Sequence, residues 1–199
     1  YCACRKLGLS LDILPPSTRD FTGYKLVLAP GLMHVSDELK SALTNCDGRV
    51  VLGPRAAART AEMQMPVPLA PSIPGLDVTV SRVESLRPDM PLDVEGGGAV
   101  QLYREELEGT ADVTLRLADG APLVMRAGRV SYLGGWLDQD ALLRLLRKTC
   151  AEVGIATLDL PDGLRLRDTG TERFWFNHTP GDVVFEGRKI PAAGVLREA

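Results

Sequence analysis

Two short apolar runs near the start of the chain enclose an amphipathic segment. Tyr24–Ala29 and Arg49–Leu52 have the length of strands and few charges, and each is followed by a glycine and a proline. Runs that are apolar on both faces, with a helical segment between them, are typical of a parallel sheet covered by helices. Residues 21–55 are therefore predicted to form a strand–helix–strand unit with a right-handed crossover, around which the rest of the chain is organised.

The helix of this unit is predicted to begin at Ser36. Serine is a favourable N-cap residue, and Asp37 and Glu38 place negative charge near the positive end of the helix dipole. The apolar side chains at helical spacing, which are expected to face the sheet, are Leu39, Ala42, Leu43 and Cys46. Asp47-Gly48 ends the helix, because glycine takes a positive φ readily.

The first residues predict another helix end and another strand. Tyr1–Leu9 carries two cations and then Gly8, which is the pattern of a last helical turn with its cap. Ser10–Leu14 is predicted to be a short strand, ended by two prolines that cannot continue a ladder. We expect a first strand upstream of Tyr1, and hence a chain that is a fragment.

A long segment without clear periodicity, Gly53–Gly75, follows the second run and is rich in Pro, Ala and Met. Loops longer than ~15 residues are uncommon in compact domains and are usually functional or bound to a partner. The segment also leaves the carboxyl end of a central strand, where open α/β sheets place their sites. We expect it to contact another chain or an absent domain, and an ordinary surface excursion is the alternative.

The remaining pattern alternates between strands and one helix. Predicted strands lie at 77–85, around 100–107, and at 113–117, 122–126 and 129–133, the last three forming an antiparallel meander that rejoins the main sheet. Gln139–Val153 is predicted to be a helix with one broad apolar face, begun by Asp138 and closed by Gly154. Short strands are then predicted at 164–167, 173–177 and 183–186. These patterns predict an α/β domain over residues 1–157 with an antiparallel excursion, followed by a small all-β domain over residues 158–199.

Composition excludes several classes of function. The chain has 199 residues, a net charge of −3 and a pI near 5.5, so it has no electrostatic footprint for nucleic acid. No apolar run approaches the ~18 residues that span a membrane. The four cysteines, at positions 2, 4, 46 and 150, lack zinc-site spacing and are expected to be free thiols in the cytoplasm.

The familiar catalytic and cofactor-binding patterns are incomplete in this sequence. The turn Gly53–Ala57 has no nucleophile, and Gly96–Gly98 lacks the lysine and helix of a phosphate loop. His34 and His178 have no carboxylate pattern beside them, and Asn177-His178-Thr179 matches a glycosylation sequon but is interpreted as a turn. The acidic residues interpreted as solvated strand positions are Glu84, Glu105 and Glu106. No catalytic, cofactor-binding or metal-binding residue is assigned, and no cofactor is expected.

Five motifs, in order, resemble the C-terminal part of glycoside hydrolase family 42 β-galactosidases. They are R-K-L-G-L-S-L-D-I-L-P-P at 5–16, Y-K-L-V-L-A-P-G-L-M-H-V-S at 24–36, G-R-V-V-L-G-P-R at 48–55, Y-L-G-G-W at 132–136 and R-F-W-F-N-H-T at 173–179. The resemblance extends over nearly all of the chain.

This resemblance implies a particular fold and role. In that family a catalytic barrel precedes a flavodoxin-like, three-layer domain similar to class I glutamine amidotransferases, through which subunits form trimers, and a small β domain follows. The chain is similar to the last two parts. It is therefore expected to be a non-catalytic oligomerisation segment of a retaining β-galactosidase, which forms a homotrimer and binds its carbohydrate substrate in the absent barrel.

Two alternatives from other classes remain. Cys46 precedes Asp47-Gly48 and is the candidate nucleophile of an amidotransferase-like hydrolase, although it ends a helix rather than following a strand. The second alternative is a flavodoxin-like module that binds a small ligand at the carboxyl edge of the sheet. The lack of a phosphate-cradling loop counts against this alternative.

Overall fold

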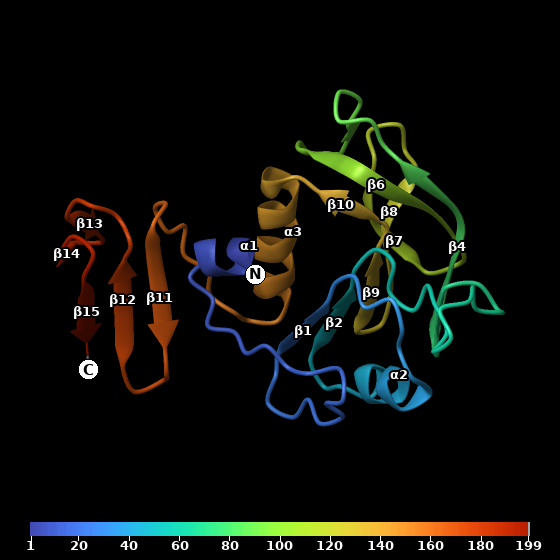
Figure 1. The fold of residues 1–199 in the computed structure, drawn as a ribbon, viewed down its shortest axis with the longest axis horizontal. Coiled ribbons are helices and arrows are strands. Elements are labelled where there is room, and N and C mark those ends of the chain that lie inside the picture. Colours follow the sequence, from blue (N-terminus) through green and yellow to red (C-terminus); the bar gives the residue numbers. More distant parts are fainter. Residues whose placement is uncertain (199) are drawn as a thin grey trace. The chain divides into compact units, whose positions relative to one another are not determined.

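The structure is a computed structural model that describes residues 1–198. The chain divides into two compact units, one made of Tyr1–Ile13 with Leu143–Ala199 and the other of Leu14–Leu142. Figure 1 shows the ribbon with its elements labelled. We call Leu14–Leu142 the large unit and the remainder the small unit, and describe each by itself.

The first sheet of the large unit has three parallel strands extended by two antiparallel ones (Figure 1). Its order is β1 (Leu26–Ala29), β2 (Arg49–Leu52), β9 (Val130–Leu133), β8 (Pro122–Ala127), β7 (Asp112–Arg116). β1 pairs with β2 in parallel, and β2 pairs in parallel with β9. The predicted strand–helix–strand unit and the return of the meander to the main sheet are both confirmed.

The second sheet of the large unit is antiparallel throughout. Its order is β10 (Gly135–Leu137), β6 (Ala99–Glu108), β4 (Leu76–Ser85), β3 (Pro71–Ile73), with β5 (Leu92–Asp93) also pairing with β6. One apolar core contains side chains of both sheets, among them Val50, Leu52, Tyr132, Ile73, Val78 and Leu107.

Helix α2 (Asp37–Thr44) covers part of this core and begins as predicted. The Ser36 hydroxyl accepts a hydrogen bond from the Leu39 amide at 3.3 Å, which satisfies one of the unpaired donors of the first turn. Leu39 and Leu43 are buried in the core.

The predicted fold class, an α/β flavodoxin-like three-layer domain, is wrong. The structure is mostly β, with about 37% of residues in strands and 14% in helices, and three helices within residues 1–198. The chain passes from β2 to β9 through β3–β8, all strands, where a doubly wound sheet would have a helix. The core shared with the second sheet explains the apolar strands, because strands buried by a second sheet are as apolar as strands buried by helices.

The small unit contains α1 (Cys2–Lys6), most of α3 (Gln139–Glu152) and the terminal strands. β11 (Leu164–Asp168), β12 (Arg173–Asn177) and β15 (Val195–Glu198) form an antiparallel sheet, and β13 (Val183–Phe185) pairs with β14 (Arg188–Ile190). Its core cluster comprises Leu160, Leu164, Leu166, Trp175 and Ile190.

These elements bear on several further expectations. Ser10–Leu14 is not a strand, and Ile13 is largely exposed, so the alternating apolar residues there do not belong to a sheet. The predicted helix over 139–153 is confirmed, as are the strands at 164–167, 173–177 and 183–186. The predicted domain boundary at residue 157 stays a prediction.

Candidate functional site: a buried carboxylate below the turn after β2

Glu105 lies in the core of the large unit with 1% of its surface exposed. Its Oε1 accepts hydrogen bonds from the Arg55 backbone N–H and the Tyr103 hydroxyl, both at 2.9 Å. Its Oε2 accepts one from the Tyr132 hydroxyl at 2.8 Å. We call these four residues the Glu105 cluster.

The interpretation of Glu105 as a solvated strand residue is therefore wrong. The other two acidic residues of that interpretation are more exposed than Glu105. Glu106 is only half-buried, and Glu84 pairs with Arg82 at 3.2 Å near the surface. A signal for the burial of Glu105 was present in the sequence. Side chains two apart in a strand share a face, and Glu105 lies two residues before the core residue Leu107.

The turn Gly53–Ala57 follows β2 and carries local backbone strain. Arg55 has φ 67° and Ala57 has φ 55°, in the left-handed region that costs non-glycine residues roughly 1–3 kcal/mol each. Gly53 is required, because a Cβ there would lie 2.6 Å from the Cα of Pro30. The turn is held by hydrogen bonds from the Ala57 amide to the Leu32 carbonyl and from the Arg55 amide to Glu105.

Burial dominates the electrostatics of the Glu105 cluster. Loss of solvation raises the pKa of the Glu105 carboxyl, and the hydrogen bonds from Tyr132, Arg55 and Tyr103 oppose that rise. Burial and the nearby carboxylate also raise the pKa of both Tyr103 and Tyr132. Both phenols therefore stay protonated and serve as donors to Glu105.

This arrangement positions the backbone of the turn. Both carboxyl oxygens of Glu105 are engaged by the protein, and the side chain that the strained turn presents is an arginine, without nucleophilic character. The Arg55 guanidinium lies over the Tyr103 ring, 5.7 Å from its centroid. The Glu105 cluster thus connects the second sheet, through β6, to the turn that leaves the first sheet.

The other candidate residues lie apart from this cluster. Cys46 lies just after α2 and is buried, so its thiol is not exposed. Its backbone carbonyl oxygen accepts a hydrogen bond from Arg129. His34 is exposed, with Nδ1 3.4 Å from the Arg59 carbonyl oxygen. Gly96–Gly98 forms a turn closed by a bond from the Val94 amide to the Gly98 carbonyl.

The sequon residue Asn177, at the end of β12, is 2% exposed. Its Nδ2 donates to the carbonyl oxygens of Gly181, Ile190 and Pro191 at 2.8, 3.3 and 3.0 Å. Its Oδ1 accepts from the backbone N–H and the hydroxyl of Thr179. A side chain engaged in this way is a structural part of the fold and is not presented for glycosylation.

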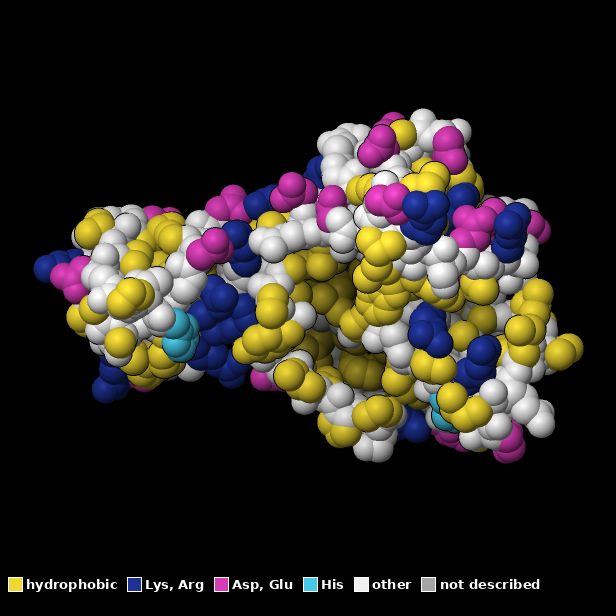
Figure 2. All heavy atoms as spheres, turned by 45° about the horizontal axis from the view of Figure 1, so that its top comes forward, with side chains coloured by type: hydrophobic (Ala, Val, Ile, Leu, Met, Phe, Trp, Pro, Cys, Tyr) yellow, Lys and Arg dark blue, Asp and Glu magenta, His cyan; other side chains and the backbone are white. Residues whose placement is uncertain are grey.

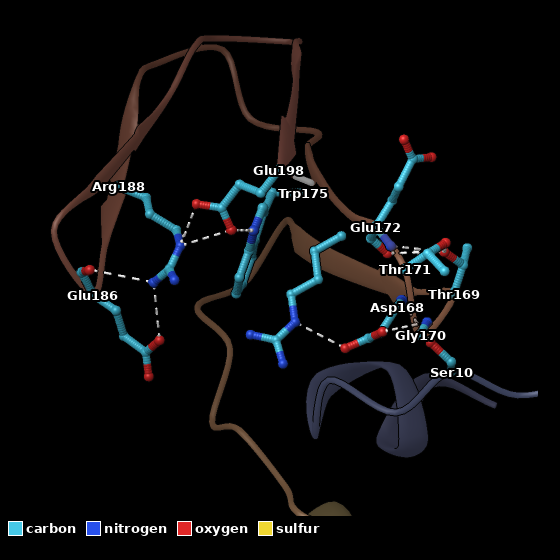
Figure 3. Close-up of polar contacts among 11 residues, drawn as sticks. Ser10, Asp168, Thr169, Gly170, Thr171, Glu172, Trp175, Glu186, Arg188 and Glu198 are labelled. Atoms are coloured by element: carbon cyan, nitrogen blue, oxygen red, sulfur yellow. Dashed lines mark hydrogen bonds and ion pairs between the residues drawn. The ribbon is translucent and has the colours of Figure 1, made fainter.

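A second polar cluster lies in the small unit (Figure 3). Glu198 accepts a hydrogen bond from the Trp175 indole N–H at 2.8 Å and two from Arg188 Nε at 2.8 and 3.0 Å. The Arg188 guanidinium also lies 5.2 Å from the centre of the Trp175 ring. The hydrogen bond from Trp175, followed by those from Arg188, lowers the pKa of the Glu198 carboxyl. These contacts fasten β15 to β12 and β14.

Asp168, the last residue of β11, makes three polar contacts that Figure 3 also draws. Its backbone N–H donates to the Ser10 hydroxyl, and its carboxylate accepts from the Gly170 N–H and from Arg173 Nε, each at 2.8 Å. Ser10 is thereby tied to the terminal sheet of its own unit. Both clusters in Figure 3 consist of groups that satisfy one another.

Within residues 1–198, no group of three or more His, Cys, Asp or Glu side chains is arranged to hold a metal ion. None of the helices there has the length and apolar character needed to cross a membrane.

The large unit is thus a strand-rich domain of two sheets, in which a buried carboxylate joins the second sheet to the turn after β2. Residues 1–156 match the family described as "Beta-galactosidase trimerisation domain". The chain belongs to this family.

Curated relatives are whole β-galactosidases. The chain is 38% identical over 189 residues to a beta-galactosidase of Thermus thermophilus, a match that covers 92% of the chain and 29% of the relative. It is 30% identical to the beta-galactosidase Bga of Halorubrum lacusprofundi, a match that covers 90% of the chain and 30% of that relative. The chain thus spans less than a third of the length of the relatives it matches.

Solved structures agree in fold. The beta-galactosidase of the psychrophilic Marinomonas ef1 superposes with a TM-score of 0.92 at 32% identity, over 99% of this chain and 32% of that one. The Halorubrum lacusprofundi enzyme superposes with a TM-score of 0.84 at 26% identity, over 99% and 34%.

Proposed function

We propose that this chain is a non-catalytic segment through which a β-galactosidase assembles into a homotrimer. The observation that carries the proposal is the match of residues 1–156 to the trimerisation domain family. Further support comes from the turn after β2, where the strained position holds Arg55, and from Glu105, whose carboxyl oxygens are both engaged internally.

The activity of the whole protein is a further part of the proposal. The relatives that match over about 90% of this chain are named beta-galactosidases, and the chain accounts for less than a third of their length. We infer that the full-length protein hydrolyses terminal β-galactosides with retention, by two carboxylates outside residues 1–199. A cytoplasmic location is part of the same proposal, supported by four cysteines that are all free.

A deletion tests this role. The full-length protein and a variant that lacks the chain are compared by light scattering after size-exclusion chromatography. The proposal predicts a mass of three copies for the full-length protein and a loss of that species in the deletion variant. A full-length protein that stays monomeric at all concentrations contradicts it. Hydrolysis of a chromogenic β-galactoside by the full-length protein tests the inferred activity separately.

A further inference from the structure

The loop between the turn and β3 exposes apolar side chains that the large unit leaves uncovered. In residues 58–69, which we call the 58–69 loop, Met63 is 59% exposed, Met65 66% and Val67 96%. Single exposed apolar residues are ordinary on protein surfaces, but several within one short loop mark an interaction surface. Figure 2 shows hydrophobic side chains, with basic ones among them, at the right of the view, where Figure 1 draws this part of the chain.

The base of the 58–69 loop is fixed at both ends. Ala56 and Ala57 before it and Ala70 and Ile73 after it are buried. The first end belongs to the turn that Glu105 holds, so the loop is supported by the core although its own apolar side chains are exposed. A surface that is already ordered loses less conformational entropy on binding than a disordered segment would lose.

Two arginines lie at the base of this loop, and the charge of Arg55 also acts on the buried carboxyl of Glu105. Arg55 and Arg59 are half-buried, and neither forms an ion pair within residues 1–198. Arg55 lies over the Tyr103 ring, and the charges of both arginines oppose the rise in the pKa of Tyr103. The surface is thus an apolar loop beside two cations that are available to a carboxylate.

A second copy of this chain has the complementary chemistry. The chain carries 26 acidic against 23 basic residues, and Glu106 and Glu108 on β6 form no ion pair in the described part. A ring of three copies joins two different surfaces of each copy at every interface. A cationic apolar surface on one copy can therefore meet an acidic surface on the next.

We propose that the 58–69 loop, with Arg55 and Arg59, is one half of the interface between copies of this chain, and that it receives carboxylates of the neighbouring copy. This inference rests on the proposed trimerisation. It adds the surface and the chemistry by which the copies are joined. The exposed methionines and Val67 supply apolar area that is buried in the interface. The two guanidinium groups pair with the carboxylates of the neighbouring copy and so fix the orientation of the two copies.

Exposed residues of the loop allow a test that does not disturb folding. In the full-length protein, Met63→Ser, Met65→Ser and Val67→Ser are combined. The control is Met90→Ser combined with Val184→Ser, at positions that are 59% and 69% exposed elsewhere on the chain. The trimer dissociation constant, measured by sedimentation velocity over a dilution series, should rise on the order of tenfold or more in the loop variant and stay unchanged in the control.

Neutralising the arginines gives an independent arm. The double variant Arg55→Gln with Arg59→Gln keeps the backbone N–H of residue 55, which donates a hydrogen bond to Glu105. This variant should also weaken the trimer on the order of tenfold. Arg87→Gln is the control, because Arg87 pairs locally with Asp89 at the surface.

Four outcomes separate the possibilities. Weakened trimers in both variants support the proposal. A full trimer with a lowered melting temperature shows that the loop packs on the rest of its own polypeptide, and a full trimer with unchanged melting shows a free surface. Either of these overturns the interface, whereas a wild-type protein that is not trimeric overturns the proposed function itself.

Discussion

At the scale of single residues, Glu105 is the side chain on which the large unit depends most. It is a charged residue type in an apolar core, and it is tolerated because two tyrosine hydroxyls and one backbone N–H donate to it. Removing it would leave these donors buried without an acceptor, which costs roughly 1–3 kcal/mol for each donor.

The raised pKa of Glu105 predicts how stability depends on pH. Because the native state binds this proton more tightly than the unfolded chain, the contribution to the free energy of unfolding is complete below the ordinary carboxyl pKa of about 4.3. It is lost as pH rises through the pKa of the folded state. We therefore expect wild type to lose stability relative to Glu105→Gln as pH rises from about 4, measured by urea unfolding at several pH values.

The neighbouring Glu106→Gln serves as the control, since Glu106 lies on the same strand but is only half-buried. Its unfolding free energy should follow that of wild type across the pH series. If the curve of Glu105→Gln also ran parallel to wild type, the burial effect on Glu105 would be refuted.

Asn177 has a comparable role in the small unit. Its amide donates to three backbone carbonyls, so Asn177→Asp would place a carboxylate against three acceptors. We expect a loss of about 3 kcal/mol or more in the free energy of unfolding, measured by denaturant titration. Asn45→Asp, at an exposed position after α2, should cost far less, and equal losses would argue against the structural role of Asn177.

At the scale of elements, local patterns predicted most of the strands and helices. Three of these patterns depend only on neighbours in sequence: the cap at Ser36, the apolar run at Arg49–Leu52 and the apolar spacing of residues 139–153. The corresponding elements, α2, β2 and α3, lie where they were expected. The prediction of a strand at Ser10–Leu14 was wrong, because alternation of apolar residues does not by itself provide a partner strand.

The cap of α2 gives a prediction at this scale. Ser36→Ala removes the acceptor for the Leu39 amide and should lower the free energy of unfolding by about 1 kcal/mol. Ser41→Ala, on the exposed side of the same helix, should be neutral or slightly stabilising, because alanine is the better helix former. Urea unfolding of both variants measures the difference, and equal effects would exclude a contribution from the cap.

At the scale of the whole molecule, the layers could not be predicted from local patterns. A strand that is apolar on both faces requires a cover, but the same side chains suit a helix or a second sheet, and Val50 and Leu52 share their core with strands β3, β4 and β6. The spacing of Glu105 from Leu107 was a local signal for its burial, but the partners that compensate for that burial, Tyr132 and Arg55, are distant in sequence. The family, by contrast, was recognisable from the order of its motifs, and the match to residues 1–156 confirms it.

The assembly is the central claim, and it belongs to this scale. Sedimentation equilibrium of the full-length protein, over a concentration range that spans nanomolar to micromolar, measures the mass of the species in solution directly. The account predicts the mass of three copies, with dissociation promoted by Met63→Ser, Met65→Ser and Val67→Ser together. A protein with the mass of one or two copies throughout that range would contradict it.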